Sequence, residues 1–398
     1  MLDIGQIHRN EYELESDRSV TIAIAESPGR VHFLGEHGDS SNGLFLSAAI
    51  DRFIRVAVNV RKDNFFRFYA ADFQERKRST LINLKYKRED RWANYLKTAV
   101  FVFIRMGIPM KGLNFTVSGD IPQQVGLASS TAIETAAAVA LRSLLHVQLS
   151  DDDLAEKLRD AHSIFFGVEA PLIDYQVCLL ARKDQFLSID ASTGEVKKIK
   201  SPFSRFRFLL VDSRVPRMGV ENELALRRSD TVKGLELLSQ KLDGATFRDF
   251  ASTDLLESMG AFPEQIRRRS MHIVQEIRRV LDGCDALERR DLAAFSRLIF
   301  HSHESLRDLY EVSCPEIDWL VKRAQEMESA AGSRMTGQGF GGCTYTIIRR
   351  ELVEEYKRRL EDYERIFGFR PVIYEVKIAT GGRMVPQRKK AYANTAHQ

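Results

Sequence analysis

The stretch from Ser27 to Gly43, SPGRVHFLGEHGDSSNG, gathers five hydrogen-bonding side chains within ten residues, directly after the strand-like run SVTIAIAE. These side chains are Arg30, His32, Glu36, His37 and Asp39. Carboxylates accept hydrogen bonds from hydroxyl groups, and a site built to bond a hydroxyl rejects a ligand that lacks it. The stretch therefore predicts a pocket for a small polyol, with an ordinary solvated loop as the alternative.

A second stretch, GLASSTA, has the residue types of a phosphate-binding loop and lies between a predicted strand and an alanine-rich, helix-forming segment. Small residues let backbone N–H groups approach an anion, and the helix start adds unpaired N–H groups and the positive end of its dipole. The hydroxyls could hold phosphate oxygens or a magnesium ion. The candidate nucleotide-binding residues are Gly126, Leu127, Ala128, Ser129, Ser130 and Thr131. The Walker sequence Gly-Lys-Ser/Thr is absent, so a helix start used only for packing is the alternative.

A third stretch, GSRMTGQGFGGCTYTI, has four glycines between positions 337 and 342, followed by a strand-like run. Glycine allows a flexible loop and close backbone packing. Taken alone, this pattern predicts a glycine hairpin. Beside a phosphate loop it could instead close over a nucleotide, and the candidate contacts are then Gly337, Gly339 and Gly341.

The composition is that of an ordinary globular protein, with 44% hydrophobic and 29% charged residues among 398. A net charge of +4, from 59 basic and 55 acidic residues, does not favour a nucleic-acid partner. No apolar run approaches the roughly 20 residues needed to span a bilayer, so we expect a cytoplasmic protein without a membrane partner. Four widely spaced cysteines form no CxxC pair, which disfavours a zinc site.

The elements that must position these stretches follow from the hydrophobic pattern. Strands are predicted at VTIAIAE, RFIRVAVNVRKD, RFYAADF, STLINL and residues 113–117, and helices at RWANYLKTAVFVFIRMG, after GLASSTA and at DDDLAEKLRDAHSIFFG. Residues 221–325 are mostly helical in pattern, between the strands FRFLLVDSRVP and GGCTYTIIRR, and VIYEVKIAT follows. This predicts two mixed lobes, residues 1–201 and 202–398, with a boundary near Pro202.

Together, SPGRVHFLGEHGD, GLASSTA and GQGFGGC resemble, in order and spacing, the three motifs of the GHMP kinase superfamily. The first resembles the galactokinase signature specifically, as does SLRDLYEVSCPEIDWLV. The resemblance runs from about Ala25 to Met384. It implies the α+β, two-lobed GHMP kinase fold, with an N-terminal mixed sheet, a C-terminal α/β lobe and an active site in the cleft between them.

The resemblance also implies an ATP-dependent sugar 1-kinase, with galactose as the expected substrate and Mg²⁺ as a cofactor. Glu36, His37 and Asp39 would bind the sugar hydroxyls. Asp174, in GVEAPLIDY, would be the catalytic base, with Arg30 beside it and the transferring phosphoryl group. Ser130 would contribute to magnesium binding, and we expect a monomer or weak dimer.

Several positions depart from the family pattern. His162 stands where the family has its magnesium-binding glutamate, and imidazole suits this hard cation poorly. Pro171 replaces a glycine, Tyr175 a glutamine and Leu224 a tyrosine that contacts the sugar. These departures leave open a kinase for a different sugar and a non-catalytic sensor that binds sugar and ATP.

Overall fold

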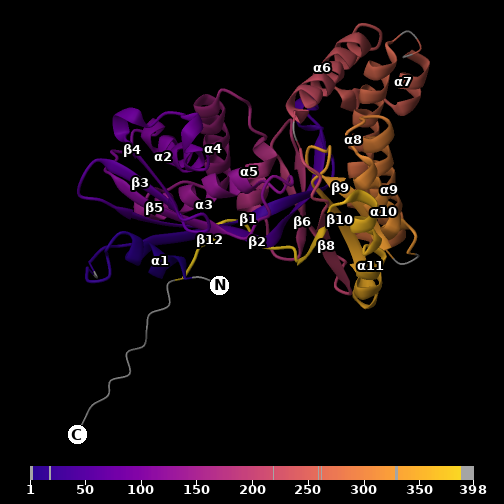
Figure 1. Ribbon diagram of the computed structural model, residues 1–398. Helices are drawn as coiled ribbons and strands as arrows, with labels where there is room; N and C mark the ends of the chain where they lie inside the picture. Colours follow the sequence, from indigo (N-terminus) through magenta and orange to yellow (C-terminus); the bar gives the residue numbers. More distant parts are fainter. Residues whose placement is uncertain are drawn as a thin grey trace.

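The computed structural model describes residues 3–386 apart from 18, 218, 259, 261, 328 and 329. Within this part of the chain, two β-sheets stand side by side, each with its own helices (Figure 1). A shared hydrophobic cluster joins them, in which Phe33 and Phe186 of the first sheet meet Tyr345 and Phe208 of the second, while Leu209, Val211 and Ile348 of the second sheet belong to a separate cluster. The predicted two-lobed α+β architecture is confirmed.

The first sheet has, among the described residues, eight strands in the order β12-β1-β2-β5-β3-β4, with β6 pairing with β2 and β7 with β6. Their bounds are β1 (Ala23–Leu34), β2 (Leu44–Val60), β3 (Phe65–Ala70), β4 (Glu75–Thr80), β5 (Leu113–Gly119), β6 (Gln185–Asp190), β7 (Val196–Lys200) and β12 (Arg383–Met384). The β3–β5 pair is parallel and the other pairs are antiparallel, so the sheet is mixed.

One face of this sheet is covered by α2 (Ala93–Arg105), α3 (Ser129–Leu144), α4 (Asp151–Phe166) and α5 (Leu172–Leu180), while α1 (Ile4–Glu11) lies on the other (Figure 1). Helix α3 packs directly on β1 and β2. Its side chains there are small, with Ala136, Ala137 and Ala140 fully buried, so the helix approaches the sheet closely. The start of α3 is thereby held beside β1.

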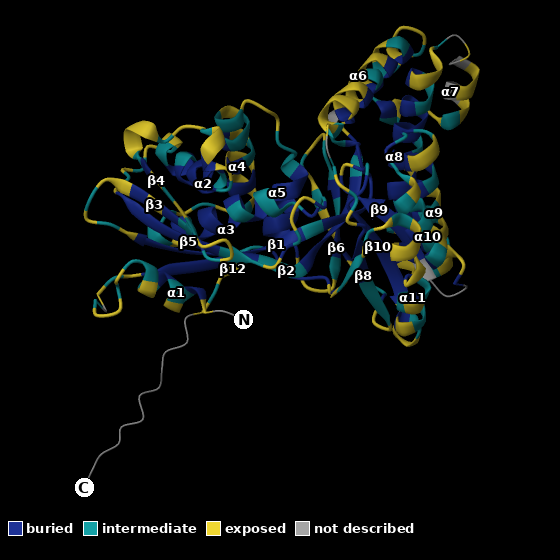
Figure 2. Ribbon diagram, in the orientation of Figure 1, coloured by how far each residue is buried: buried dark blue, intermediate teal, exposed yellow. Residues whose placement is uncertain are grey.

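The second sheet is antiparallel, in the order β11-β8-β10-β9. Its strands are β8 (Phe206–Asp212), β9 (Ala330–Thr336), β10 (Cys343–Arg349) and β11 (Val372–Val376). The helices of this lobe are α6 (Val220–Ser239), α7 (Ser252–Ser258), α8 (Glu264–Arg289), α9 (Leu292–Asp308), α10 (Pro315–Gln325), α11 (Val353–Arg359) and α12 (Asp362–Phe367). Short 3₁₀ turns are η1 (Asp39–Ser41), η2 (Leu81–Asn83), η3 (Arg88–Asp90), η4 (Phe247–Asp249) and η6 (Arg350–Leu352). Figure 2 shows the central strands β1 and β2 mostly buried and the outer helix faces exposed.

After β11 the chain returns to the first sheet, where Met384 pairs with Ala25. The C-terminal lobe therefore contributes a short edge strand to its neighbour. The boundary near Pro202 stays a prediction. None of the described helices is both long and apolar enough to cross a membrane.

Two local predictions were wrong. The strand predicted at VTIAIAE continues as β1 to Leu34, so Arg30 and His32 lie on a strand and not in a loop. A register shift at Pro28/Gly29 lets the hydrogen bonding to β2 continue past the proline, which satisfies the buried backbone groups. STLINL was predicted as a strand, but only its first two residues belong to β4, and Leu81–Asn83 forms a 3₁₀ turn. Ile82 is 95% exposed, so the apolar residues of this segment do not form a buried face.

Candidate active site

The predicted pair Arg30 and Asp174 is in direct contact. Asp174 lies in the first turn of α5, and Arg30 reaches it from β1 with two hydrogen bonds, Nε to Oδ1 at 2.6 Å and Nη2 to Oδ2 at 2.9 Å. Pro171 caps this helix with φ −65° and ψ 120°, which is the backbone geometry that a proline ring favours before a helix. A bidentate pair of this kind fixes the carboxylate in both position and plane.

His32, two residues further along β1, also faces the Asp174 carboxylate. Its Nε2 lies 3.2 Å from Oδ1 of Asp174, and its Nδ1 lies 2.7 Å from Oγ of Ser47. Burial alone would raise the pKa of the Asp174 carboxyl, but the charge of Arg30 and the contact with His32 outweigh it and hold this pKa well below its usual range. Asp174 is therefore a carboxylate that can accept a hydrogen bond from a substrate hydroxyl.

Arg30 also connects the carboxylate to the predicted phosphate loop. Its Nη1 donates to the carbonyl of Gly126 at 2.7 Å, and its backbone N–H donates to the carbonyl of Leu127 at 3.1 Å. Ala128 then takes a left-handed conformation, with φ 58°, and α3 begins at Ser129. The N-terminus of α3 and the Arg30–Asp174 pair are thus held together through a single arginine.

The glycine-rich stretch 337–342 contacts the predicted phosphate loop GLASSTA. A β-carbon on Gly126 would lie 2.9 Å from Cα of Gly337, and both glycines have positive φ, 87° and 82°. The other two candidates pack elsewhere, because a β-carbon on Gly339 would meet the carbonyl of Val312 and one on Gly341 would meet Val215. The stretch forms the turn of the β9–β10 hairpin, so the hairpin prediction is confirmed, while its closure over a nucleotide stays a prediction.

Arg217 joins the glycine-rich hairpin to the loop before α3 and was not predicted from the sequence. Its Nη2 donates to the carbonyl of Gly341 at 2.7 Å and its Nη1 to that of Gln124 at 3.3 Å. An isolated arginine after a strand carries no pattern by which it could have been found. Its positive charge lies where the loops before α3 and before β10 come together.

Glu36 is buried against a residue of the other lobe. Its Oε2 accepts a hydrogen bond of 2.5 Å from Nη2 of Arg334, which lies on β9 and is fully buried. Arg334 also reaches Glu276 of α8 and Ser302 of α9 through Nη1, and the backbone N–H of Gly35 donates to Glu276. The end of β1 is therefore fixed to the C-terminal lobe by charged hydrogen bonds. Burial alone would lower the pKa of Arg30, but the charge of Asp174 and, to a smaller extent, that of Glu36 raise it.

The next two predicted sugar contacts lie toward α6 and α9. The ring of His37 stacks on Tyr310 with centroids 4.5 Å apart, and within the described part of the chain its buried Nε2 has no hydrogen-bond partner. Burial, with His272 and Arg228 nearby, lowers the pKa of His37 well below its usual value, so the imidazole is neutral. Asp39 lies in η1, and its Oδ2 is 3.8 Å from Nη2 of Arg228.

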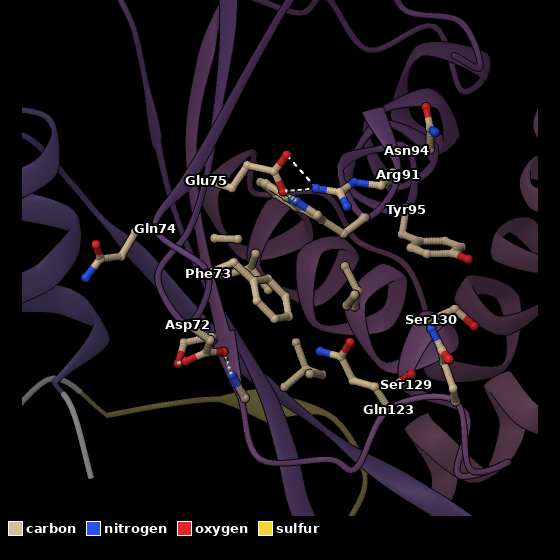
Figure 3. Close-up of a pocket in the computed structure, with 18 of the residues that line it drawn as sticks. Asp72, Phe73, Gln74, Glu75, Arg91, Asn94, Tyr95, Gln123, Ser129 and Ser130 are labelled. Atoms are coloured by element: carbon tan, nitrogen blue, oxygen red, sulfur yellow. Dashed lines mark hydrogen bonds and ion pairs between the residues drawn. The ribbon is translucent and has the colours of Figure 1, made fainter. Parts of the chain in front are cut away.

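A cavity of about 870 Å³ opens beside the start of α3 (Figure 3). Ser129 and Ser130 line one side of it, and Glu75 and Arg91 lie on another. Glu75 accepts hydrogen bonds from Nη2 of Arg91 at 2.7 Å and from Nε1 of Trp92 at 2.8 Å, which fixes that wall. The aromatic lining residues are Phe73, Tyr86, Trp92, Tyr95 and Phe166.

Flat aromatic walls beside a helix N-terminus suit a base and its attached phosphates. This aromatic set was not predicted from the sequence, because its members come from four separate segments and share no spacing.

Magnesium prefers oxygen ligands, and the described residues meet this preference only in part. Ser130 offers a hydroxyl at the cavity, but no group of three or more His, Cys, Asp or Glu side chains in the described part of the chain could hold a metal ion. His162 is bound to Glu134, with Nδ1 2.9 Å from Oε1, and its ring stacks on Phe166 at 4.4 Å. His162 therefore does not fit the role of a magnesium ligand.

Three family models match this chain: GHMP kinases N terminal domain over residues 94–182, GHMP kinases C terminal over 285–365, and galactokinase galactose-binding signature over 8–60. The chain is 37% identical over 390 residues to a putative galactokinase of Treponema pallidum, which covers 97% of each chain. It is 34% identical to a galactokinase of Roseiflexus sp., which covers 97% of this chain and 98% of that one. The chain belongs to the galactokinase family.

A galactokinase of Lactococcus lactis, solved in complex with galactose, has the same fold. Its TM-score is 0.90 at 23% identity, and the match covers 96% of this chain and 100% of the other. The galactokinase signature spans the segment that contains Arg30 and Glu36, and the N-terminal GHMP model spans both Ser130 and Asp174. The chain is thus a galactokinase-type GHMP sugar kinase, and the family that the sequence resemblance indicated is confirmed.

Proposed function

We propose that this protein transfers the γ-phosphoryl group of ATP to the anomeric hydroxyl of galactose and releases galactose 1-phosphate and ADP. The observation that carries the proposal is the bidentate contact between Arg30 and Asp174, made by the same arginine that bonds the phosphate loop at Gly126. A carboxylate that can receive a hydroxyl proton is thereby coupled to the loop that would hold the phosphates.

In this proposal Asp174 first orients the attacking hydroxyl. The low pKa of Asp174 makes it a weak base, which fits a loose transition state in which the hydroxyl becomes acidic only as the new O–P bond forms. Arg30 has two tasks: it keeps Asp174 ionised, and its guanidinium stabilises the charge that develops on the transferring phosphoryl group.

The nucleotide would occupy the cavity beside α3. The aromatic side chains, among them Trp92 and Tyr95, suit the base, while Ser129 and Ser130 and the N–H groups of the first turn suit the phosphates. The contact between Gly126 and Gly337 supports a role for the third stretch in shaping this phosphate site.

Magnesium would be held by the Ser130 hydroxyl together with the phosphate oxygens of ATP. When bound, the ion would neutralise part of the negative charge on the phosphates. His162 takes no part in this assignment, because its Nδ1 is engaged with Glu134.

Glu36, His37 and Asp39 are proposed to bind the sugar. Glu36 is held by Arg334, so its carboxylate is oriented before a ligand arrives, and Asp39 lies near the charge of Arg228. Leu224 is buried in the helical core of the C-terminal lobe and offers the sugar no hydrogen bond. Specificity would therefore depend on the β1–η1 segment.

A single experiment tests the function. ATP consumption is measured with Mg²⁺ over a panel of galactose, glucose, mannose and talose, beside calorimetric binding of the same sugars. Turnover with galactose is expected. Turnover only with another sugar would reassign the substrate, and binding of sugar and ATP without turnover would support the sensor interpretation.

Two further expectations, a cytoplasmic location and a monomer or weak dimer, stay predictions. Size-exclusion chromatography with light scattering tests the second.

A further inference from the structure

Three helices of the N-terminal lobe converge on one buried carboxylate, that of Glu134 in α3. Its side chain is fully buried, and each of its oxygens has a partner from a different helix. His162 of α4 lies with Nδ1 2.9 Å from Oε1, and the hydroxyl of Tyr175 in α5 donates to Oε2. Two of the departures noted in the sequence, His162 and Tyr175, therefore meet at the same side chain.

The partners are themselves tightly held. Tyr175 is only 1% exposed, and burial together with the charge of Glu134 raises its pKa well above the usual value. The phenol therefore stays protonated and acts as a hydrogen-bond donor to Glu134. The ring of His162 stacks on Phe166 with centroids 4.4 Å apart, and Tyr95 lies beside both rings, with its centroid 6.4 Å from that of His162 and 5.3 Å from that of Phe166. A polar group buried this deeply needs its partner, because losing one leaves an unsatisfied donor or acceptor.

This cluster lies next to both halves of the proposed active site. Glu134 follows Ser130 by one helical turn on α3, and Tyr175 directly follows Asp174 on α5. The three side chains thus connect the helix whose start would hold the phosphates to the helix that carries the proposed base.

We propose that Glu134, His162 and Tyr175 form a positioning unit, which sets the place of α5 relative to α3 and so holds Asp174 at the correct distance from the bound phosphates. This inference rests on the proposed function. It assigns His162 to the positioning of a catalytic helix, at the position where the family resemblance implied a magnesium ligand. The unit differs from the Arg30 contact, because it acts on α5 through the neighbouring residue, Tyr175.

A cluster that only stabilised the core would give a different result from a positioning unit. Loss of a purely stabilising contact lowers the melting temperature and leaves kcat per folded molecule unchanged. Loss of a positioning contact lowers kcat while KM for ATP and galactose changes little, because misplacement of the reacting groups acts in the transition state.

The test compares Tyr175→Phe and His162→Gln with a matched control, Tyr356→Phe. The control removes an equally buried hydroxyl, which lies 3.1 Å from Oγ1 of Thr346 in the C-terminal lobe. We expect kcat of the first two variants to fall by about tenfold or more, with KM values within about twofold of wild type. Tyr356→Phe should keep the wild-type kcat. Glu134→Gln, which can still bond both partners, should retain more activity than Glu134→Leu.

Amide hydrogen exchange of residues 172–180 gives a readout that does not depend on turnover. Exchange there should be faster in Tyr175→Phe and His162→Gln than in wild type, and unchanged in Tyr356→Phe. Unchanged exchange in both variants, or kcat within about twofold of wild type despite a lower melting temperature, would overturn the proposal. If wild-type protein itself fails to phosphorylate galactose, the proposed function fails, and the exchange measurement still decides whether the unit holds α5.

Discussion

Gly126 and Gly337 touch backbone to backbone, although they belong to different lobes. A β-carbon on Gly337 would lie 2.8 Å from Cα of Gly126, which is closer than side-chain atoms normally approach. The contact joins the loop before α3 to the hairpin between β9 and β10. It also explains why each stretch has a glycine at this position.

The variant Gly337→Ala should therefore weaken ATP binding, because the two loops must separate to admit the methyl group. Gly368→Ala is the matched control: Gly368 also has a positive φ, 75°, but nothing lies within 4 Å of an added β-carbon. The control should lose about 1–2 kcal/mol of unfolding free energy from backbone strain alone and keep its ATP affinity. Calorimetry measures the ATP affinity, and urea unfolding measures the free energy of unfolding. Equal ATP affinity in the two variants would show that the loop contact does not shape the nucleotide site.

Replacing the proposed base tests the chemistry. Asp174→Asn should lower kcat by about 10²- to 10⁴-fold, as expected for loss of a general base, and leave ATP binding intact. Asp63→Asn, which removes another carboxylate bonded to an arginine, Arg61, far from α5, should keep wild-type turnover. If Asp174→Asn keeps most of the wild-type kcat, Asp174 is not the base.

The pKa of Asp174 predicts how Arg30 affects stability at different pH. In wild type, the folded-state pKa lies below the unfolded value of about 3.9, so the stabilisation is fully present above that pH and is lost only as pH falls toward the folded value. In Arg30→Met the main opposing charge is gone and burial raises the pKa. The stabilisation is then present at low pH and lost as pH rises through the raised value.

We therefore expect the destabilisation of Arg30→Met, relative to wild type, to be smaller at pH 5 than at pH 7. At pH 7 it should reach about 3–5 kcal/mol, the usual cost of leaving a buried charge unpaired. Urea unfolding at both pH values measures it, with Arg365→Met, which removes an exposed pair with Asp362, as the control. A difference that grows toward pH 5 would contradict the assigned direction of the pKa shift.

Arg334 predicts a link between stability and sugar binding. Arg334→Met leaves the carboxylates of Glu36 and Glu276 buried without this partner, so it should cost about 3–5 kcal/mol of unfolding free energy and weaken galactose binding. Arg359→Met, which removes a partly exposed pair with Glu355, should cost at most about 1 kcal/mol. Wild-type galactose affinity in folded Arg334→Met would separate Glu36 from the sugar site.

The sequence predicted those structural features that depend on residues close together in the chain. Helix α3 and its glycine-rich start were identified because small residues and helix-forming residues follow one another directly. The pairing of Arg30 with Asp174 came from the family resemblance, since 144 positions separate them.

Contacts between segments that are far apart in the chain could not be predicted from the sequence. Glu36 and Arg334 are 298 positions apart, and the Glu134–His162 contact joins two helices whose relative placement no local pattern encodes. The sequence shows that His162 and Tyr175 depart from the family pattern, but only the structure shows that both side chains contact Glu134. The end of β1 was misplaced for a related reason, because polar residues on a strand that is paired and buried look like a loop.

The most direct test of the central claim is identification of the product by ³¹P nuclear magnetic resonance. Wild-type protein is incubated with ATP, Mg²⁺ and galactose. We predict a phosphorus signal coupled to the anomeric proton of galactose, formed by wild type and nearly lost with Asp174→Asn. Galactose and ATP that both bind, with no phosphorylated sugar formed, would contradict the account.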